Sequence, residues 1–446
     1  MDNENNLEKQ LGMHVFLTSS KGLGGKIKLY PEDFIVEEHL TNGLIAYIHP
    51  NPNQFQSFQN KNEDKGSYQL CIMIKRNIDT LTVLKYIAKA FKISEKRLSI
   101  AGLKDSKALT AQFIAFKKLK LKQSKVLFNG EIKIFPVKLI NEPLNSSFLL
   151  GNNFTVRIRN IDLKFNEAEE AVESILKEIK DAGGIPNFFG HQRFGTIRPI
   201  THIVGKYIVK RNFEKAVLTY LGSSSFYEKP EIKKAREELL ETLNFKKALQ
   251  IFPDYLEYEK IILKHLVTHP NDYIGALKRL PSRLRLLFVN AYQSFLFNEM
   301  LSKRILMKIP INKALEGDWV FENSKLVKVS HININELNKK IEEEKASLAL
   351  PIIGYQSKLS NGIQGEIEKE ILEKEGLTLR DFYIGAMPEA SSAGGFRTAL
   401  AKVKNIKFEI EEDKNIVFKF FLDKGCYATV FLREIMKPKN LIKAGF

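Results

Sequence analysis

Segments with the alternation of β-strands lie near both ends of this chain of 446 residues, and a long helical stretch separates them. SYQLCIMIK, residues 67–75, alternates with the period of a strand, and EIKIFPVKLI and NNFTVRIRN alternate as well. From about Thr201 to Asp381 the apolar residues recur at helical spacing, as in LRLLFVNAYQSFLFNEML. Strand-like alternation returns over residues 405–435. The pattern predicts an α/β (α+β) protein with a mixed or antiparallel sheet, in which residues 201–385 are inserted between the parts 1–200 and 386–446 of one core; three consecutive domains are the alternative.

Local signals indicate where some elements begin. Asp79 is placed to cap a helix that follows the first alternating strand. Asn166 and Glu169 have the spacing of a capping box, and Ala168, Val172, Ile175 and Ile179 form the apolar side of the helix that it opens. Ser106 is a candidate helix start. The polar stretch Asn51–Lys65 predicts a surface loop, and Asp413–Asn415 predicts a turn.

The charge balance points to a polyanionic partner. Lys and Arg number 69 against 52 Asp and Glu, which gives a formal net charge of +17. Seven lysines and one acid lie between Lys104 and Lys125, so phosphate contacts are expected there, close to Asp105; a solvated lysine face is the alternative. Nucleic acid is therefore the first candidate partner and a membrane surface the second.

Several classes of site and location are disfavoured. The chain has no apolar run of the ~18 residues that a membrane span needs, and its start lacks a signal peptide, so we expect a cytoplasmic protein without a membrane partner. Two cysteines and no clustered histidines make a metal site unexpected. GLGGK, residues 22–26, has neither P-loop nor dinucleotide-binding spacing, so no nucleotide cofactor is expected.

Two segments hold residues suited to chemistry. In AGLKDSKALTAQF, Lys104 adjoins Asp105, and a neighbouring ammonium favours the ionised carboxylate needed of a nucleophile or base; a turn-capping role for Asp105 is the alternative. GIPNFFGHQRFG combines glycines, ring faces for stacking and Arg193 as a fork for phosphate, which suits a single-stranded base. Core packing of its phenylalanines is the alternative.

These two segments resemble motifs of the TruD-type tRNA pseudouridine synthases, and the length and basicity of the chain are similar to those of archaeal members. PEDFIVEE, LGNNFTVRIR, NAYQSFLFNEML and KGCYATVFLRE also resemble family motifs in the expected order, so the resemblance spans nearly the whole chain. It implies a pseudouridine synthase catalytic core, interrupted by a TRUD domain. No cofactor is implied.

The resemblance also implies roles for individual residues. Asp105 matches the aspartate that helps to break the glycosidic bond of a uridine, whose base then rotates and is rejoined to the sugar through C5. Attack at C1′, attack at C6 and formation of a glycal all remain open. The expected substrate-binding residues are the stacking Phe189, its neighbour Asn187, Lys28 and Phe34 near the site, Lys104, Arg193 and Arg433.

The expected substrate is tRNA, with the uridine at position 13 as the first target. Related members of the family also modify an anticodon uridine of a precursor tRNA or other RNAs. A non-catalytic RNA-binding protein is the alternative from another class. The candidate cations of the inserted domain for gripping tRNA are Lys206, Lys210, Arg211, Lys278, Arg279, Arg283 and Arg285.

Overall fold

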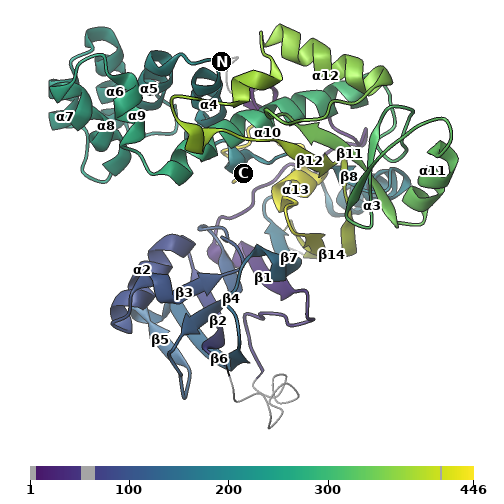
Figure 1. Ribbon diagram of the computed structural model, residues 1–446. Helices are drawn as coiled ribbons and strands as arrows, with labels where there is room; N and C mark the ends of the chain where they lie inside the picture. Colours follow the sequence, from purple (N-terminus) through teal and green to yellow (C-terminus); the bar gives the residue numbers. More distant parts are fainter. Residues whose placement is uncertain (1–6, 52–65, 412–413) are drawn as a thin grey trace.

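A large mixed sheet receives strands from both ends of the chain (Figure 1). The computed structural model describes residues 7–51, 66–411 and 414–446, so the predicted loop over Asn51–Lys65 and the predicted turn at Asp413–Asn415 lie largely or partly outside the described residues. The strands follow the order β14-β15-β7-β1-β4-β2-β6-β5, and β3 pairs with β4. Their bounds are β1 Phe34–Leu40, β2 Tyr68–Arg76, β3 Leu98–Ile100, β4 Leu109–Lys117, β5 Lys125–Leu127, β6 Ile132–Ile140, β7 Leu149–Ile158, β14 Val403–Glu411 and β15 Asn415–Asp423.

The strand directions confirm the predicted mixed sheet. β1 runs parallel to β4, whereas the other pairings in this sheet are antiparallel. The C-terminal hairpin of β14 and β15 joins the N-terminal strands because β15 pairs with β7. The two ends of the chain therefore share one sheet.

The alternation in β2 has the predicted consequence. Leu70, Ile72 and Ile74 pack into one apolar cluster, while Cys71 and Met73 face a second cluster on the other side of the sheet. Helix α2, Thr80–Ala90, covers that second side. Asp79 caps α2 as predicted, since its side chain accepts a hydrogen bond from the backbone N–H of Thr82 at 2.9 Å.

Three local predictions are wrong. Helix α3, Phe165–Asp181, begins before Asn166, and its box is formed by Glu167, which accepts from the backbone N–H of Lys164 at 3.4 Å. Its predicted apolar side is buried. Ser106 starts no helix, because the chain turns there and enters β4. Residues 428–435 form part of helix α13, Ala428–Met436, rather than strands, and every residue of α13 is buried.

The middle of the chain is helical, as predicted, and has an apolar core of its own beside the sheet (Figure 1). Its longest helix, α10, packs closely against α4. A small sheet of order β10-β9-β11-β12 and the pair β8–β13 complete the fold, while a short helix, α1, Leu7–Gln10, lies near the start. The bounds are α4 Thr201–Val209, α5 Phe213–Gly222, α6 Pro230–Thr242, α7 Phe245–Ile251, α8 Glu257–Thr268, α9 Tyr273–Lys278, α10 Ser282–Leu306, α11 Ile334–Glu342, α12 Gly362–Lys374, β8 Ile185–Pro186, β9 Trp319–Glu322, β10 Lys325–Lys328, β11 Ala346–Ile352, β12 Gly395–Thr398 and β13 Leu400–Ala401.

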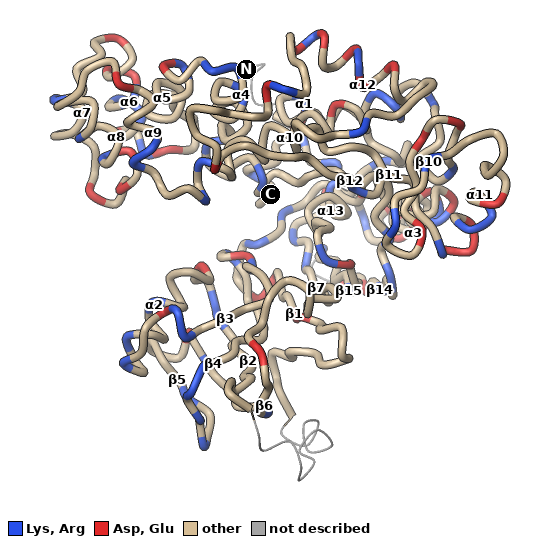
Figure 2. Tube along the Cα trace, viewed as in Figure 1, with Lys and Arg blue, Asp and Glu red and all other residues tan. Residues whose placement is uncertain are grey.

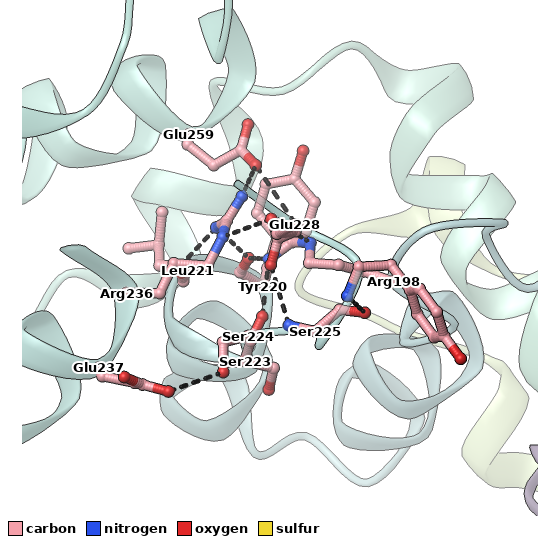
Figure 3. Close-up of polar contacts among 11 residues, drawn as sticks. Arg198, Tyr220, Leu221, Ser223, Ser224, Ser225, Glu228, Arg236, Glu237 and Glu259 are labelled. Carbon is pink, nitrogen blue, oxygen red and sulfur yellow. Dashed lines mark hydrogen bonds and ion pairs between the residues drawn. The ribbon is translucent and has the colours of Figure 1, made fainter. Parts of the chain in front are cut away.

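A buried charge network joins α6 and α8 to the segment that precedes α4 (Figure 3). Arg236 of α6 donates to Glu228 at 3.0 Å and to Glu259 of α8 at 2.9 Å. Arg198, just before α4, also donates to Glu259, at 3.2 Å, and to the carbonyl oxygens of Tyr220 and Ser223. Within the described ranges, no helix combines the length and apolarity that a membrane crossing requires.

Candidate active site

Parallel pairing of β1 and β4 brings two distant loops together. Ile35 is opposite Leu109, so the segments that precede the two strands meet at the same edge of the sheet. Lys28 lies before β1 and Asp105 before β4, and Lys28 Nζ is 3.1 Å from Asp105 Oδ1. Lys28 has a left-handed backbone (φ 56°), which is uncommon for a residue with a side chain and recurs at functional sites.

Asp105 has two further hydrogen-bond donors. Gln192, in the short turn His191–Arg193, donates from Nε2 to Asp105 Oδ1 at 2.5 Å. Lys75 Nζ donates to the backbone carbonyl oxygen of Asp105 and, at 2.9 Å, to that of Ile78. Burial lowers the pKa of Lys75 to about 8, although the negative charges of Asp105 and Asp79 oppose that shift.

The ammonium of Lys104 is not the one that pairs with Asp105. Lys104 Nζ lies 2.6 Å from Glu38 Oε1, and both side chains are buried. Glu38 Oε2 also accepts from the backbone N–H of Phe113 at 2.7 Å. Lys104 thus belongs to a buried ion pair beneath the site, and the neighbouring charge expected beside Asp105 comes from Lys28, far away in sequence.

Asp105 lines a cavity of about 250 Å³ that has aromatic walls. Phe34 and Phe154 come from the neighbouring strands β1 and β7, with ring centroids 6.0 Å apart. Lys28 Nζ lies 4.3 Å from the Phe34 ring centroid. Tyr427 enters from the turn between β15 and α13. The lining residues are Phe34, Val36, Leu103, Lys104, Asp105, Leu149, Asn152, Phe154, Gln192, Gly425, Cys426, Tyr427, Ala428 and Thr429.

Two residues that line this cavity have a buried polar atom without a hydrogen-bond partner among the described residues. Asn152 Oδ1 and Thr429 Oγ1 are buried and make no hydrogen bond within the described part of the chain. A buried polar atom without a partner is costly, so such atoms are natural ligand contacts. Sequence reasoning missed Asn152, Thr429, Tyr427 and Gln192. The motifs LGNNF, KGCYAT and GHQRF contain them, but motif recognition alone does not tell which side chain faces Asp105.

Phe189 and Asn187 lie outside the lining of the Asp105 cavity. Phe189 is 8 % exposed and packs edge-on against Tyr427, with ring centroids 6.3 Å apart. Its backbone N–H donates to Asn298 Oδ1 at 2.8 Å, which fixes the ring in the interior. Asn187 accepts hydrogen bonds from Arg397, a residue that sequence reasoning also missed. These residues form a layer behind Tyr427.

Arg193 and Arg433, two further predicted substrate-binding residues, do not line the Asp105 cavity and bind other parts of the protein. Arg193 Nε donates to Ser294 Oγ at 3.0 Å, and its guanidinium lies 5.7 Å from the Phe189 ring centroid. Arg433 is 1 % exposed and donates to Glu8 at 2.6 Å, so it anchors α13 to the N-terminal segment. Burial and the nearby positive charges of Arg433 and Lys28 lower the pKa of His191 to about 3, which keeps its imidazole neutral.

The lysine tract is not as close to Asp105 as its sequence position suggests. β4 separates the two, and from Leu109 to Lys117 an extended strand spans about 26 Å. Lys107 is exposed two residues after Asp105, whereas Lys117 ends β4 and the exposed Lys118, Lys120 and Lys122 follow it. Figure 2 shows the positions of Lys and Arg along the trace. The expectation of a whole tract beside the carboxylate is wrong because neighbours in sequence separate along a strand.

The cations of the helical region differ in their availability. Lys210, Lys278, Arg279 and Arg283 are exposed. Arg285 is buried and donates to the carbonyl oxygens of α9 and the following turn. Lys206 pairs with Glu375 at 2.8 Å and Arg211 with Asp381 at 2.8 Å. In the described ranges, no three His, Cys, Asp or Glu side chains are grouped so as to hold a metal ion.

The arrangement is suited to holding a planar ring beside a carboxylate. Phe34 and Tyr427 offer ring faces, and Asn152 and Thr429 offer unpaired polar atoms. Asp105 is held by Lys28 and Gln192 and remains 24 % exposed, so a bound group can approach it. A carboxylate in such a position can act as a nucleophile or as a base.

Comparisons with known proteins identify the family of this chain. The family model described as tRNA pseudouridine synthase D (TruD) matches residues 10–435. A relative from Methanosarcina mazei, described as a probable tRNA pseudouridine synthase D, is 37% identical over 449 residues and covers 98% of each chain. One from Pyrococcus furiosus with the same description is 35% identical, covering 95% of this chain and 98% of its own.

A solved structure supports the same conclusion. The crystal structure assigned as TruD of Methanosarcina mazei superposes with a TM-score of 0.78 at 35% identity and covers 98% of both chains. Sequence and fold thus agree over almost the full length. The chain belongs to the TruD family of tRNA pseudouridine synthases, which are isomerases.

Proposed function

We propose that this protein converts uridine to pseudouridine in tRNA, with Asp105 acting on the glycosidic bond and without a cofactor. The supporting observation is the Asp105 carboxylate on a cavity with aromatic walls, held by Lys28 and Gln192. The reaction breaks the bond from C1′ to N1 and forms one from C1′ to C5. N1 gains a hydrogen and C5 loses one, so the isomerisation balances without an oxidant or a reductant.

The cavity must retain the base while it is detached from the sugar. Phe34 and Tyr427 supply ring faces that pack against a pyrimidine. Uracil presents an N3–H donor and two carbonyl oxygens, and Asn152 and Thr429 have unpaired polar atoms that can pair with them. These contacts keep the base within reach of C1′ while it rotates.

Access to Asp105 requires the uridine to leave its stack, which costs a few kcal/mol. Leu103 adjoins the cavity and is 64% exposed, so it can occupy part of the space that the uridine vacates. The family resemblance makes position 13 of tRNA the first uridine to test. The anticodon uridine of a precursor tRNA is the alternative target.

The test uses unmodified tRNA transcripts and two proteins, the wild type and Asp105→Asn. Pseudouridine is mapped by carbodiimide-dependent primer-extension stops, and tRNA binding is measured in parallel. We expect one uridine to be modified by the wild type only, with similar tRNA affinity for both proteins, because the substitution removes the reacting charge and little volume.

Two results would contradict the proposal. Full activity of Asp105→Asn would exclude Asp105 as the reacting group. Binding without modification by the wild-type protein, across all tRNAs and a precursor with its intron, would favour the non-catalytic RNA-binding alternative.

A further inference from the structure

Two donors meet at one oxygen of the Asp105 carboxylate. Lys28 Nζ lies 3.1 Å from Asp105 Oδ1, and Gln192 Nε2 lies 2.5 Å from the same atom. Among the described residues, Oδ2 accepts no hydrogen bond, so it is the oxygen left to meet a substrate. The direction in which Oδ2 points therefore depends on where Lys28 and Gln192 hold Oδ1.

The turn at residues 441–446, which follows α13, supports the chain beside Lys28. The turn is closed by the backbone N–H of Phe446, which donates to the Leu441 carbonyl oxygen at 3.0 Å. Leu441, Ala444 and Phe446 are all buried. The Ala444 carbonyl oxygen accepts a hydrogen bond from the N–H of Ile27 at 2.8 Å. The turn thus fixes the backbone from which the Lys28 ammonium extends.

Gly445 makes this contact close. Its φ is 95°, and a Cβ atom at this position would collide with the Ile27 carbonyl oxygen, so a residue with a side chain would push the two segments apart. Ile27 is 1% exposed, and Lys28 has a left-handed backbone with a φ of 56°. Because neither residue has room to adjust, a shift of the turn would move Lys28.

The Phe446 ring supports the residue before Gln192. It packs edge-on against the His191 ring, with centroids 5.8 Å apart and an angle of 78° between the planes. Within the described part of the chain, neither ring nitrogen of His191 makes a hydrogen bond, so its place depends on packing. Gln192 belongs to the same short turn, His191–Arg193, and would move with it.

We propose that residues 444–446 position the Asp105 carboxylate by holding Ile27 and His191, the sequence neighbours of its two donors. The inference rests on the proposed function for the reaction that Asp105 performs. None of the three residues lines the Asp105 cavity, so they act through Lys28 and Gln192 and not on the substrate. A reacting group misplaced by about 1 Å can lower a rate by about 100-fold.

The first test compares Gly445→Ala with Gly130→Ala. The two glycines have nearly the same left-handed φ, 95° and 93°, so alanine strains the backbone equally at both. The Cβ position of Gly130, however, is open among the described residues. We expect Gly445→Ala to lower kcat by about tenfold or more, and Gly130→Ala to keep the kcat of the wild type.

Steady-state kinetics with tRNA, together with thermal melting, measure this difference. KM should stay unchanged in both variants, because phosphate contacts along the RNA dominate its affinity. An unaltered kcat in a folded Gly445→Ala protein would overturn the proposal, and so would an equal loss of kcat in Gly130→Ala.

The second test separates positioning from a general loss of stability. Phe446→Ala and Phe252→Ala each remove a buried ring, the latter from the core of the helical region, so both should lower the melting temperature. Only Phe446→Ala should lower kcat. Introduced into Gln192→Ala, it should lower kcat further by less than about threefold, because the donor through which it acts is already gone. Its full effect in that background would exclude action through Gln192.

Hydrogen exchange tests the support without catalysis. The amides of residues 26–30 should exchange faster in Gly445→Ala and those of residues 191–194 faster in Phe446→Ala, whereas α8 should keep its rates in both. Unchanged exchange in both segments would contradict the support itself. If the wild type modifies no uridine in any tRNA, the proposed function fails, while the exchange rates still show whether residues 444–446 hold the two segments.

Discussion

Asn152 illustrates how a single side chain can be unfavourable for stability and useful for binding. Its Oδ1 atom is buried without a hydrogen bond in the described structure, in the wall of the Asp105 cavity. Leaving such an atom unpaired costs about 1–3 kcal/mol. A base that donated its N3–H would remove that cost, so part of the binding free energy would come from satisfying Asn152.

Asn152→Ala should therefore lower kcat/KM for tRNA by about tenfold or more, the effect of losing about 1.4 kcal/mol, with no loss of thermal stability. Steady-state kinetics and thermal melting provide the measurements. Asn153→Ala is the matched control, because the next residue of β7 points to the other face of the sheet. Equal kinetic losses in both variants would contradict the assignment of Asn152 to the base.

The buried Lys75 side chain should make the free energy of unfolding depend on pH over a defined range. Burial lowers its pKa to about 8 from an ordinary value of 10.5. Between these two values the unfolded chain binds more protons at this residue than the folded chain does, so this residue's contribution to the free energy of unfolding rises with pH. The rise amounts to up to about 3 kcal/mol, since one pKa unit corresponds to about 1.4 kcal/mol.

The stability of the wild type relative to Lys75→Met should consequently increase from pH 8 to pH 10.5 and stay constant from pH 6 to pH 7.5. Thermal melting of both proteins across this range measures the difference, in which the contributions of all other residues largely cancel. A constant difference up to pH 10.5 would mean that Lys75 keeps its proton when buried.

At the scale of elements, sequence reasoning succeeded where a pattern is local. The strands β2, β6 and β7, the cap of α2 and the buried side of α3 follow from periods and caps that lie within one segment. Helix α13 did not follow, because its N-cap residue, Tyr427, makes no side-chain capping hydrogen bond and all of its residues are buried.

The candidate site also depends on contacts that no local sequence pattern reveals. Asp105, Lys28 and Phe34 meet because β1 and β4 pair in parallel, and that pairing joins segments far apart in sequence. The motifs placed Lys28 and Phe34 near Asp105, as the structure does. They also suggested Phe189, which lies behind Tyr427, since residue order within a loop does not reveal which ring faces a cavity.

The charge network of Figure 3 connects the segment before α4 to helices α6 and α8. Arg198 and Arg236 share Glu259, which is 6% exposed. Glu259→Ala would leave both guanidinium groups without this acceptor, and breaking a buried pair costs about 3–5 kcal/mol. We expect faster hydrogen exchange in α5, α6 and α8 and a lower melting temperature.

Glu257→Ala, at an exposed position of the same helix, is the control and should change neither quantity. The double variant Arg236→Met with Glu259→Ala should recover part of the lost stability, because one of the two buried charges is then removed. Exchange that increased across the whole chain rather than in these helices would show that the network does not act locally.

At the scale of the whole molecule, the net charge of +17 and the location of the lysines have separate consequences. Any reduction of net charge weakens the general attraction of tRNA, whereas removing a lysine that touches a phosphate also removes one counterion-release contact. Lys118, Lys120 and Lys122 are exposed just after β4, at the end of the strand remote from Asp105. We expect them to contact the body of the tRNA while the uridine is at Asp105.

Replacing these three lysines by glutamine should raise KM, leave kcat unchanged and reduce the slope of log affinity against log salt by up to about 3, near one per lost phosphate contact. Lys339, Lys369 and Lys374, exposed on α11 and α12, form a control triple that lowers the net charge equally. Binding titrations over a range of salt concentrations measure both slopes. If the two triple variants have the same slope, the lysines near β4 act only through net charge; if only the first slope falls, the tRNA extends along β4 from Asp105 to the far end of the strand.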